Sequence, residues 1–216
     1  MLKIAVFDTG YGGELFADRL EQELPVVEVI RIIAWRNAKR IEEHPFTARK
    51  LTEESLRPYI GNVDLLVIAN YQISATCLSY FRRKYPNQKF IGFSLSPERI
   101  VKRPTIILTT KSTTKNLTYF TVARRLKAKT ICLDNWPLLI DDGELTDDNF
   151  KTDLEPALKH MTIPKTCQIF LACGQFNDCI QKFRQIFGHN ARIVDSFDHT
   201  IHEAYHTLGL RSLRKT

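Results

Sequence analysis

The stretch of sequence that decides the fold reads Lys3-Ile4-Ala5-Val6-Phe7-Asp8-Thr9-Gly10-Tyr11-Gly12-Gly13. Its first part is almost entirely apolar, which is typical of a strand buried on both faces of a parallel sheet. The glycines after Asp8 permit a tight turn into a helix, and free backbone N–H groups at such a helix start can hold a carboxylate or a phosphate. The pattern is neither GxGxxG nor a P-loop, so it gives little support to nucleotide binding.

Apolar runs of similar character recur along the chain, and segments with helical spacing of apolar residues lie between them. Phe176, Ile180 and Phe183 illustrate that helical spacing. Strands that alternate with helices predict an α/β fold with parallel sheets and right-handed crossovers. The expected strands are 3–7, 26–33, 65–69, 90–93, 105–108, 130–133, 169–172 and 193–194.

The spacing of the strand ends indicates an internal repeat. Asp8 and Asn70 follow the first and third strands and are 62 residues apart, whereas Thr110 and Cys173, at the matching places in the second half, are 63 apart. We therefore predict two pseudo-symmetric, Rossmann-like lobes, each with a mostly parallel four-stranded sheet, and a cleft between them. The expected lobes are residues 1–92 plus 197–216, and residues 93–196. Because ligands bind beyond the carboxyl ends of parallel strands, these four side chains are expected to line that cleft.

Composition narrows the class of protein. The chain has 216 residues, of which 44% are hydrophobic and 25% are charged, as in an ordinary globular protein. No run approaches the roughly 18 apolar residues of a membrane span, and the N-terminus lacks the zones of a signal peptide, so a cytoplasmic protein with no membrane partner is expected. The five cysteines form no CxxC pair and are expected to be thiols.

The net charge of +7 comes from basic residues that are scattered along the chain. The densest groups are 82–84, 124–127 and 211–215, and none is interleaved with aromatic residues in a nucleic-acid motif. Solvated helix faces are therefore favoured over a nucleic-acid interface.

Motifs in order along nearly the whole chain resemble the aspartate/glutamate racemase superfamily, and glutamate racemase most closely. The segment 4–13 is similar to the opening strand and Asp-Ser-Gly-x-Gly-Gly turn of that family, and 66–75 is similar to Val-Ile-Ala-Cys-Asn-Thr-Ala-Ser-Ala. Residues 171–175 are similar to Leu-Gly-Cys-Thr-His. Further matches are Pro45-Phe46, Thr110, Thr113, Tyr119 and Asp195-Ser196.

The resemblance implies racemisation without a cofactor, in which one cysteine removes the Cα proton and a second cysteine returns one on the opposite face. Cys173 matches the second cysteine, but Asn70 stands at the first, and Gln175 replaces the histidine that assists Cys173. An amide does not titrate near neutrality and cannot be a general base, so two-base racemisation is doubted. Asp8 and Thr110 match groups that hold the amino acid, so a pocket for a small carboxylate or amino acid is expected.

The resemblance thus implies a set of site residues and no metal. Asn70 is expected opposite Cys173, and Gln175 is expected beside the thiol as a hydrogen-bond donor. The predicted catalytic positions are Cys173, Asp8, Asn70 and Gln175. The predicted ligand positions are Asp8, Thr9, Pro45, Phe46, Asn70, Tyr71, Ser74, Thr110, Thr113, Cys173 and Gly174.

Two functions stay open. The first is an enzyme that works with one cysteine, resembling relatives that decarboxylate malonates and protonate the enediolate on one face, with Ser74, Thr110 and Tyr119 as candidates for its oxyanion hole. The second is a non-catalytic protein of this fold with a regulatory or ligand-binding role. Nucleic-acid binding ranks last, and a homodimer stays open. Reactivity of Cys173 towards a small alkylating agent separates the first two.

One motif lies outside this pattern. His202-Glu203-Ala204-Tyr205-His206 fits HExxH, which on a helix can bind zinc through both histidines with the glutamate as general base. Only ten residues follow His206, and the segment coincides with the last helix of the resembled family, which carries no metal. Histidines on a solvated helix face are therefore the favoured interpretation.

Overall fold

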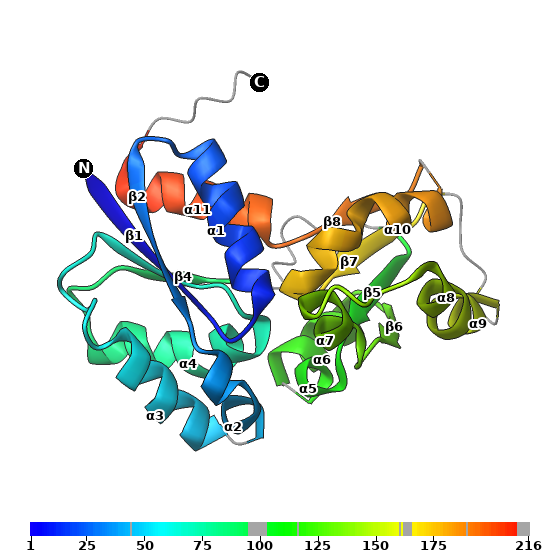
Figure 1. Ribbon diagram of the computed structural model, residues 1–216, viewed down its shortest axis with the longest axis horizontal. Coiled ribbons are helices and arrows are strands. Elements are labelled where there is room, and N and C mark those ends of the chain that lie inside the picture. The colour runs from blue at the N-terminus through cyan, green and yellow to red at the C-terminus, as the bar shows by residue number, and fades with distance from the viewer. Residues whose placement is uncertain are drawn as a thin grey trace. The chain divides into compact units, whose positions relative to one another are not determined.

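Two four-stranded parallel sheets, rather than one continuous sheet, organise the chain (Figure 1). The computed structural model describes residues 1–43, 45–94, 103–115, 117–159, 161, 166–188 and 190–210, so the basic group 211–215 lies outside the described residues. The chain divides into lobe 1 (Met1–Ser94 and Ser196–Thr216) and lobe 2 (Leu95–Asp195). The predicted α/β class with two similar parallel sheets is confirmed. No described helix is long and apolar enough to cross a membrane.

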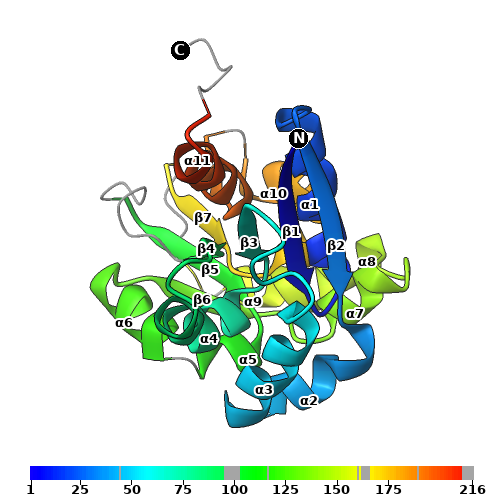
Figure 2. The ribbon, with the colours of Figure 1, turned by 90° about the vertical axis from the view of Figure 1, so that its left-hand side faces the viewer.

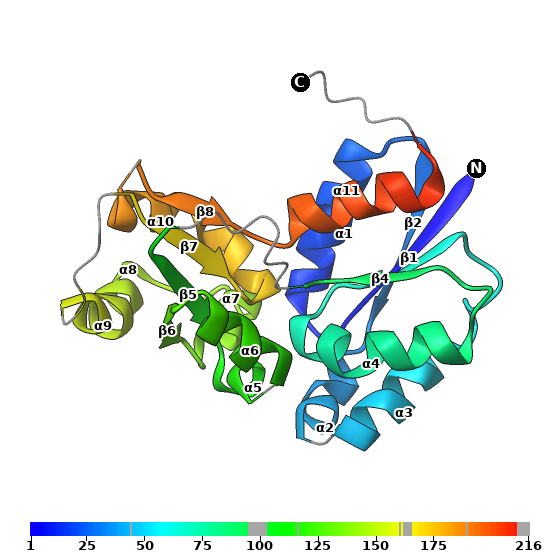
Figure 3. The same cartoon turned by 180° about the vertical axis from the view of Figure 1, so that it is seen from behind.

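The sheet of lobe 1 has the strand order β2-β1-β3-β4, and Figure 2 shows these strands side by side, with β4 on the left and β2 on the right. Helices α1 and α11 cover one face of this sheet, and α2, α3 and α4 cover the other (Figures 1 and 3). The elements are β1 (Leu2–Asp8), α1 (Tyr11–Glu23), β2 (Val27–Ile33), the 3-10 turn η1 (Trp35–Asn37), α2 (Ala38–Glu43), α3 (Pro45–Leu56), β3 (Leu65–Ile68), α4 (Tyr71–Lys84), β4 (Phe90–Gly92) and α11 (Phe197–Leu208).

The sheet of lobe 2 repeats this order as β6-β5-β7-β8. Its elements are β5 (Thr105–Thr109), α5 (Lys111–Thr114), α6 (Leu117–Arg125), β6 (Lys129–Cys132), α7 (Trp136–Asp141), α8 (Asp147–Asn149), the π-helical turn η3 (Phe150–Leu154), α9 (Glu155–Lys159), β7 (Gln168–Leu171), the 3-10 helix η4 (Gly174–Cys179), α10 (Ile180–Phe187) and β8 (Arg192–Val194).

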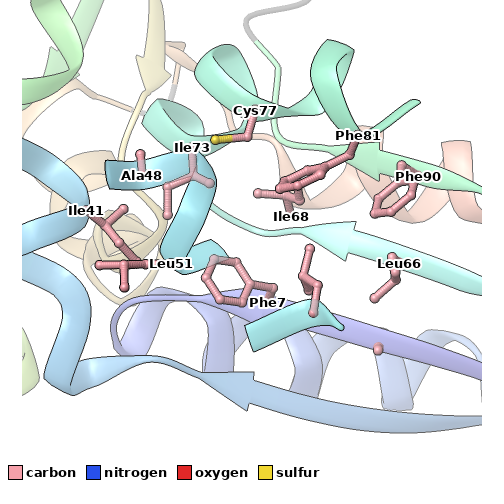
Figure 4. Close-up of a cluster of buried hydrophobic side chains, with 12 residues drawn as sticks. Phe7, Ile41, Ala48, Leu51, Leu66, Ile68, Ile73, Cys77, Phe81 and Phe90 are labelled. Carbon is pink, nitrogen blue, oxygen red and sulfur yellow. The ribbon is translucent and has the colours of Figure 1, made fainter. Parts of the chain in front are cut away.

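The core of lobe 1 forms where α4 packs on the sheet (Figure 4). Ile73, Cys77 and Phe81 follow one another at intervals of four residues, so they share one face of α4, and all three are buried. They pack with Phe7 of β1 and Phe90 of β4, whose apolar side chains the strand pattern places in the interior. This packing fixes the start of α4 above the ends of β1 and β3.

On the opposite face of lobe 1, α11 packs beside α1. Phe16 of α1 makes edge-to-face contacts with Phe93 and with Phe197 of α11, with ring centroids 5.1 and 5.3 Å apart. The Tyr205 hydroxyl donates to the Glu23 carbonyl at 2.7 Å. The last helix is therefore part of lobe 1, although the whole of lobe 2 separates it from the other elements of lobe 1 in sequence.

Lobe 2 has an aromatic core. Trp136 of α7 contacts Phe150 of η3, Phe176 of η4 and Phe183 of α10, with ring centroids 4.5–6.2 Å apart. Its indole Nε1–H donates to Asp153 at 3.0 Å, so the buried ring keeps a polar partner. These contacts hold η4, which starts immediately after Cys173, against the sheet. On α6, Val122 is buried, whereas Phe120 is 58% exposed.

The two sheets share one backbone frame at their strand ends. Ala69 N donates to Phe7 O in lobe 1, and Ala172 N donates to Leu108 O in lobe 2, both at 2.8 Å. Asn70 and Cys173 come next in the chain after these two alanines. They therefore occupy equivalent places in the two lobes, beyond the ends of the third strand of each sheet.

Candidate functional site

The strand-end edge of lobe 1 joins Asp8, Thr9 and Asn70. Asp8 ends β1 and Asn70 follows β3, and these strands are neighbours, with Phe7 paired to Ile68. The Asn70 amide Nδ2 donates to Asp8 Oδ1 at 2.9 Å and to Thr9 Oγ1 at 3.3 Å. Thr9 N also donates to Asp8 Oδ1 at 2.6 Å. The three residues therefore form one small hydrogen-bonded network, in which Asp8 and Thr9 are buried.

Asn70 also begins α4. Its backbone is extended, and its side-chain Oδ1 accepts from Ile73 N at 3.0 Å, which is the geometry of an N-cap. Both ends of the amide are thus engaged, the oxygen with the helix and the nitrogen with Asp8 and Thr9. A cysteine could fill neither role well, because a thiol is a weak donor and a weak acceptor. At this place the side chain acts as a structural connector.

Two glycines let the backbone approach this edge closely. A Cβ at Gly13 would stand 2.4 Å from Asp8 Cβ, and a Cβ at Gly92 would stand 2.5 Å from Ser74 Oγ. Ser74 is buried and donates to the Ile68 carbonyl at 2.8 Å. In this geometry Ser74 ties α4 to the end of β3. The close approach of α1 to Asp8 explains the glycine at position 13 of the opening turn.

The other predicted ligand residues of lobe 1 are Tyr71, Pro45 and Phe46. Tyr71 is buried, its hydroxyl lies 2.5 Å from Ser196 Oγ, and its ring packs on Phe93 with centroids 5.4 Å apart. Phe46 on α3 is 70% exposed, and Pro45 is the first residue of that helix. Ser196 was predicted only as part of the segment before the last helix, and its pairing with Tyr71 had no signal in the sequence.

The strand-end edge of lobe 2 begins with a cluster of three hydroxyls. Thr110 follows β5, and its Oγ1 lies 2.9 Å from Ser112 Oγ and 3.3 Å from Thr113 Oγ1. Ser112 was not among the predicted residues, although its place two residues after Thr110 in a turn is a signal that could have identified it. Tyr119 is buried and its hydroxyl lies 2.7 Å from Thr130 Oγ1, and burial raises the pKa of this phenol.

Cys173 stands at the neighbouring strand end. Leu108 of β5 pairs with Leu171 of β7, so Thr110 and Cys173 both lie two residues beyond one pair of the ladder. Cys173 has an extended backbone, is partly exposed, and its Sγ donates to Gln175 Oε1 at 3.1 Å. Gln175 was expected to be a donor, and this expectation is wrong. The protonated thiol is the donor, so the amide presents its oxygen.

The other four cysteines differ from Cys173 in position, and burial raises the pKa of each. Burial raises the pKa of Cys77 on α4, and that of Cys179 at the end of η4, to about 12 in each case. Burial also raises the pKa of Cys167 and of the exposed Cys132, the latter with help from Asp134. These four thiols are therefore held in the neutral form, and none follows the third strand of a sheet.

The HExxH segment forms part of α11. His202 and His206 are exposed, and their Nε2 atoms lie 3.2 Å apart. Glu203 approaches Arg82 at 3.5 Å instead of a position between the two rings. Among the residues that the structure describes, no group of three or more His, Cys, Asp or Glu side chains could hold a metal ion. The arrangement therefore lacks the third protein ligand of a catalytic zinc site.

Each lobe thus gathers part of the predicted site. Lobe 1 brings Asp8, Thr9 and Asn70 into contact, and lobe 2 places Thr110 and Cys173 at neighbouring strand ends. The opposition of Asn70 and Cys173 across a cleft stays a prediction.

The comparisons with known proteins agree on the fold. No protein-family model and no curated protein matches the sequence. Among solved structures, the chain is similar to the glutamate racemase of Campylobacter jejuni subsp. jejuni, with a TM-score of 0.83 and 20% identity over 100% of this chain and 89% of that chain. It is also similar to the Escherichia coli glutamate racemase in complex with L-glutamate and the activator UDP-MurNAc-Ala, with a TM-score of 0.83 and 18% identity over 98% of this chain and 84% of that chain.

A third solved structure is similar to this chain over nearly its whole length, with a lower TM-score. The aspartate racemase of Picrophilus torridus has a TM-score of 0.67 and 11% identity, over 98% of this chain and 96% of that chain. The chain therefore has the fold of the aspartate/glutamate racemase superfamily, and at these identities the similarity shows the fold alone.

Proposed function

We propose that this protein binds a small carboxylate or amino acid at the strand ends of its racemase-type fold, with acid–base chemistry at Cα limited to Cys173. The observation that carries the proposal is the contrast between the two equivalent positions. Asn70 has no titratable group and is engaged by α4 and Asp8, whereas Cys173 has a thiol beside an amide acceptor. One proton carrier serves one face of a carbon, and racemisation needs two.

The chemistry of the thiol follows from its partner. The S–H of Cys173 donates to Gln175 Oε1, so the thiol is oriented by a neighbouring acceptor. For Cα–H exchange, the ionised form of Cys173 takes the Cα proton, the sulfur exchanges that proton with solvent, and it returns one to the same face. For decarboxylation, the bond from Cα to the carboxylate breaks, CO2 leaves, and the electron pair left on Cα takes the proton from sulfur. The C–H bond forms, the S–H bond breaks, and the thiolate regains a proton from water. Thr110 and its hydroxyl neighbours are the proposed partners of the substrate carboxylate.

The alternative is a non-catalytic protein that only binds such a ligand. Asn70 supports it, because an amide that caps a helix and holds Asp8 is retained for structure whether or not chemistry occurs. The two functions share the ligand class and differ only in what Cys173 does.

The test uses D- and L-glutamate and D- and L-aspartate in deuterated water, with Cα–H exchange followed by proton NMR and binding followed by calorimetry. One-cysteine chemistry predicts exchange into a single enantiomer without formation of the other, and loss of exchange in Cys173→Ser with binding retained. Binding without exchange supports the non-catalytic alternative.

Binding variants complete the test. Asp8→Ala and Thr110→Val should each weaken a dicarboxylate ligand about tenfold or more, the usual effect of removing a hydrogen bond to a charged group. Rapid exchange of both enantiomers contradicts the limit to one cysteine, and absence of any binding contradicts both functions.

A further inference from the structure

Helix α11 presents two histidines in a geometry that the proposed function does not use. His202 and His206 are four residues apart, so they lie on one face of the helix, and both are exposed. Their rings have centroids 4.4 Å apart at an interplanar angle of 70°, and their Nε2 atoms lie 3.2 Å apart. The two Nε2 atoms are thus within hydrogen-bond distance of each other on the exposed side of the helix.

This separation fits two ligands of one metal ion. With Zn–N bonds of about 2.05 Å, two nitrogens 3.2 Å apart subtend an angle of about 100–105° at the metal, between tetrahedral and square-planar values. We propose that His202 and His206 form a two-histidine site for a divalent transition-metal cation, with water in the remaining coordination positions.

The class of cation follows from the ligands. Imidazole nitrogen suits Cu²⁺, Ni²⁺ and Zn²⁺, whereas Mg²⁺ and Ca²⁺ prefer oxygen. For a site of this kind the expected order of affinity is Cu²⁺ above Ni²⁺ and Zn²⁺.

The packing of α11 gives the site a rigid base. Ile201 and Tyr205, which each precede one of the histidines by one residue, are buried, and the Tyr205 hydroxyl donates to the Glu23 carbonyl. The backbone that carries both histidines is therefore fixed by lobe 1 before any metal binds, which reduces the entropy cost of chelation.

The charged residues near the two histidines favour metal binding alone over a hydrolytic reaction at this site. Glu203 pairs with Arg82, and Lys89 donates to the Thr207 carbonyl at 2.9 Å, so two cations lie along this side of the helix. They disfavour a dication, and Glu203 only partly offsets them. Because Glu203 is held by Arg82, it is not placed as the general base of a hydrolytic HExxH centre.

The experiment titrates the full chain, free of any affinity tag and stripped of metal, with NiCl2 in a calorimeter, and repeats the titration with ZnCl2 and MgCl2. The expected result is saturable binding of one Ni²⁺ and one Zn²⁺ per chain and no heat with Mg²⁺. His202→Ala and His206→Ala should each weaken Ni²⁺ binding by about 10²-fold, because a chelate gains that factor from its second ligand.

Glu203→Gln is the matched control. It changes the residue between the two ligands without removing either, so Ni²⁺ affinity should stay within about twofold. Circular dichroism would show that the alanine variants keep their helix content. Absence of saturable Ni²⁺ binding by the unmodified chain, or undiminished Ni²⁺ binding by either alanine variant, would overturn the proposal without affecting the proposed function at Asp8, Thr110 and Cys173.

Discussion

The two lobes have the same backbone hydrogen bonds at their strand ends, but different side chains follow those ends. In lobe 1, Asn70 follows β3, caps α4 and bonds to Asp8 and Thr9. In lobe 2, Cys173 follows β7 at the equivalent place, caps nothing with its side chain, and donates its S–H to Gln175. The same strand-to-helix junction thus supports a closed polar network in one lobe and a titratable group in the other.

The helices after these residues show the consequence. The capped α4 runs regularly for 14 residues, whereas Cys173 leads into the six-residue 3-10 helix η4 before α10 begins. The N-cap hydrogen bond satisfies a backbone N–H of the first turn, and a cysteine side chain does not supply it. An asparagine at this junction therefore stabilises the fold, and a cysteine leaves its side chain available for chemistry.

The largest expected effect separates the thiols of the two lobes by reactivity. Cys77 is the only cysteine of lobe 1, and burial raises its pKa to about 12, so about one molecule in 10⁴ is ionised at pH 8. Its alkylation by iodoacetamide should be at least about 10³-fold slower than that of an ordinary exposed thiol. Partly exposed Cys173 should be labelled before Cys77 and Cys179, as measured by mass spectrometry of the native protein.

Cys173→Ser is the control for that experiment, because it should remove the label at position 173 and leave the labelling of the exposed Cys132 and of the slow, buried thiols unchanged. In urea all five thiols should react at similar rates. Labelling of Cys77 as early as Cys173 in the folded protein would contradict the difference between the lobes.

A second comparison concerns the residue five positions after the last residue of the first strand in each lobe, which is Gly13 in lobe 1 and Thr114 in lobe 2. Gly13→Ala would place a Cβ 2.4 Å from Asp8 Cβ, which cannot rotate away, so α1 must shift. The expected loss is about 3 kcal/mol in the free energy of unfolding, measured by urea denaturation. Thr114→Ala removes only a local bond to the Lys111 carbonyl and should cost less than about 1 kcal/mol. Equal costs would show that the close approach is not specific to lobe 1.

A third comparison removes the two equivalent side chains themselves. Asn70→Ala deletes the cap of α4 and the donor to Asp8, and should lower the free energy of unfolding by about 2 kcal/mol. Cys173→Ala deletes one weak hydrogen bond and should change it by about 0.5 kcal/mol or less. Urea denaturation of both variants gives the difference directly. A larger loss in the free energy of unfolding for Cys173→Ala than for Asn70→Ala would contradict the structural role given to Asn70.

The fold could be predicted from the sequence because strand pattern and topology are tied closely together. Each apolar run became a strand within about two residues of its expected bounds, for example β6 at Lys129–Cys132 instead of 130–133. The continuous helix expected around Phe176 is the exception. There Phe176 N donates to Cys173 O and the Asn177 side chain donates to Gly174 O, so a 3-10 helix forms before α10.

The site was harder to predict because the direction of a hydrogen bond depends on which partner has the hydrogen. The place of Gln175 beside Cys173 follows from their spacing, but its role as acceptor depends on the protonated thiol. Likewise the sequence places Asn70 at a strand end, and only the position of α4 shows that its amide oxygen faces Ile73 N. The type and order of residues predict where a side chain lies, whereas the direction in which it points depends on how the helix packs.

The smallest expected effect compares the carboxylates that join helices in each lobe. Glu53 of α3 accepts from Lys84 at 2.7 Å and from the hydroxyls of Tyr85 and Tyr80, and although burial raises the pKa of Glu53, these bonds outweigh it and lower the pKa overall. A carboxyl whose pKa is lowered by folding stabilises the protein above its unfolded pKa, and this contribution is lost as the pH falls through the folded value. Glu53→Gln should therefore reduce the urea midpoint at pH 7, with a difference from the unmodified protein that shrinks as the pH falls below about 4. In lobe 2, Asp147 is exposed and accepts from Lys182, and this hydrogen bond lowers the pKa of Asp147. Because solvent screens an exposed pair, Asp147→Asn should shift the midpoint less than Glu53→Gln at every pH, and a larger shift for Asp147→Asn would contradict the greater importance of the lobe 1 network.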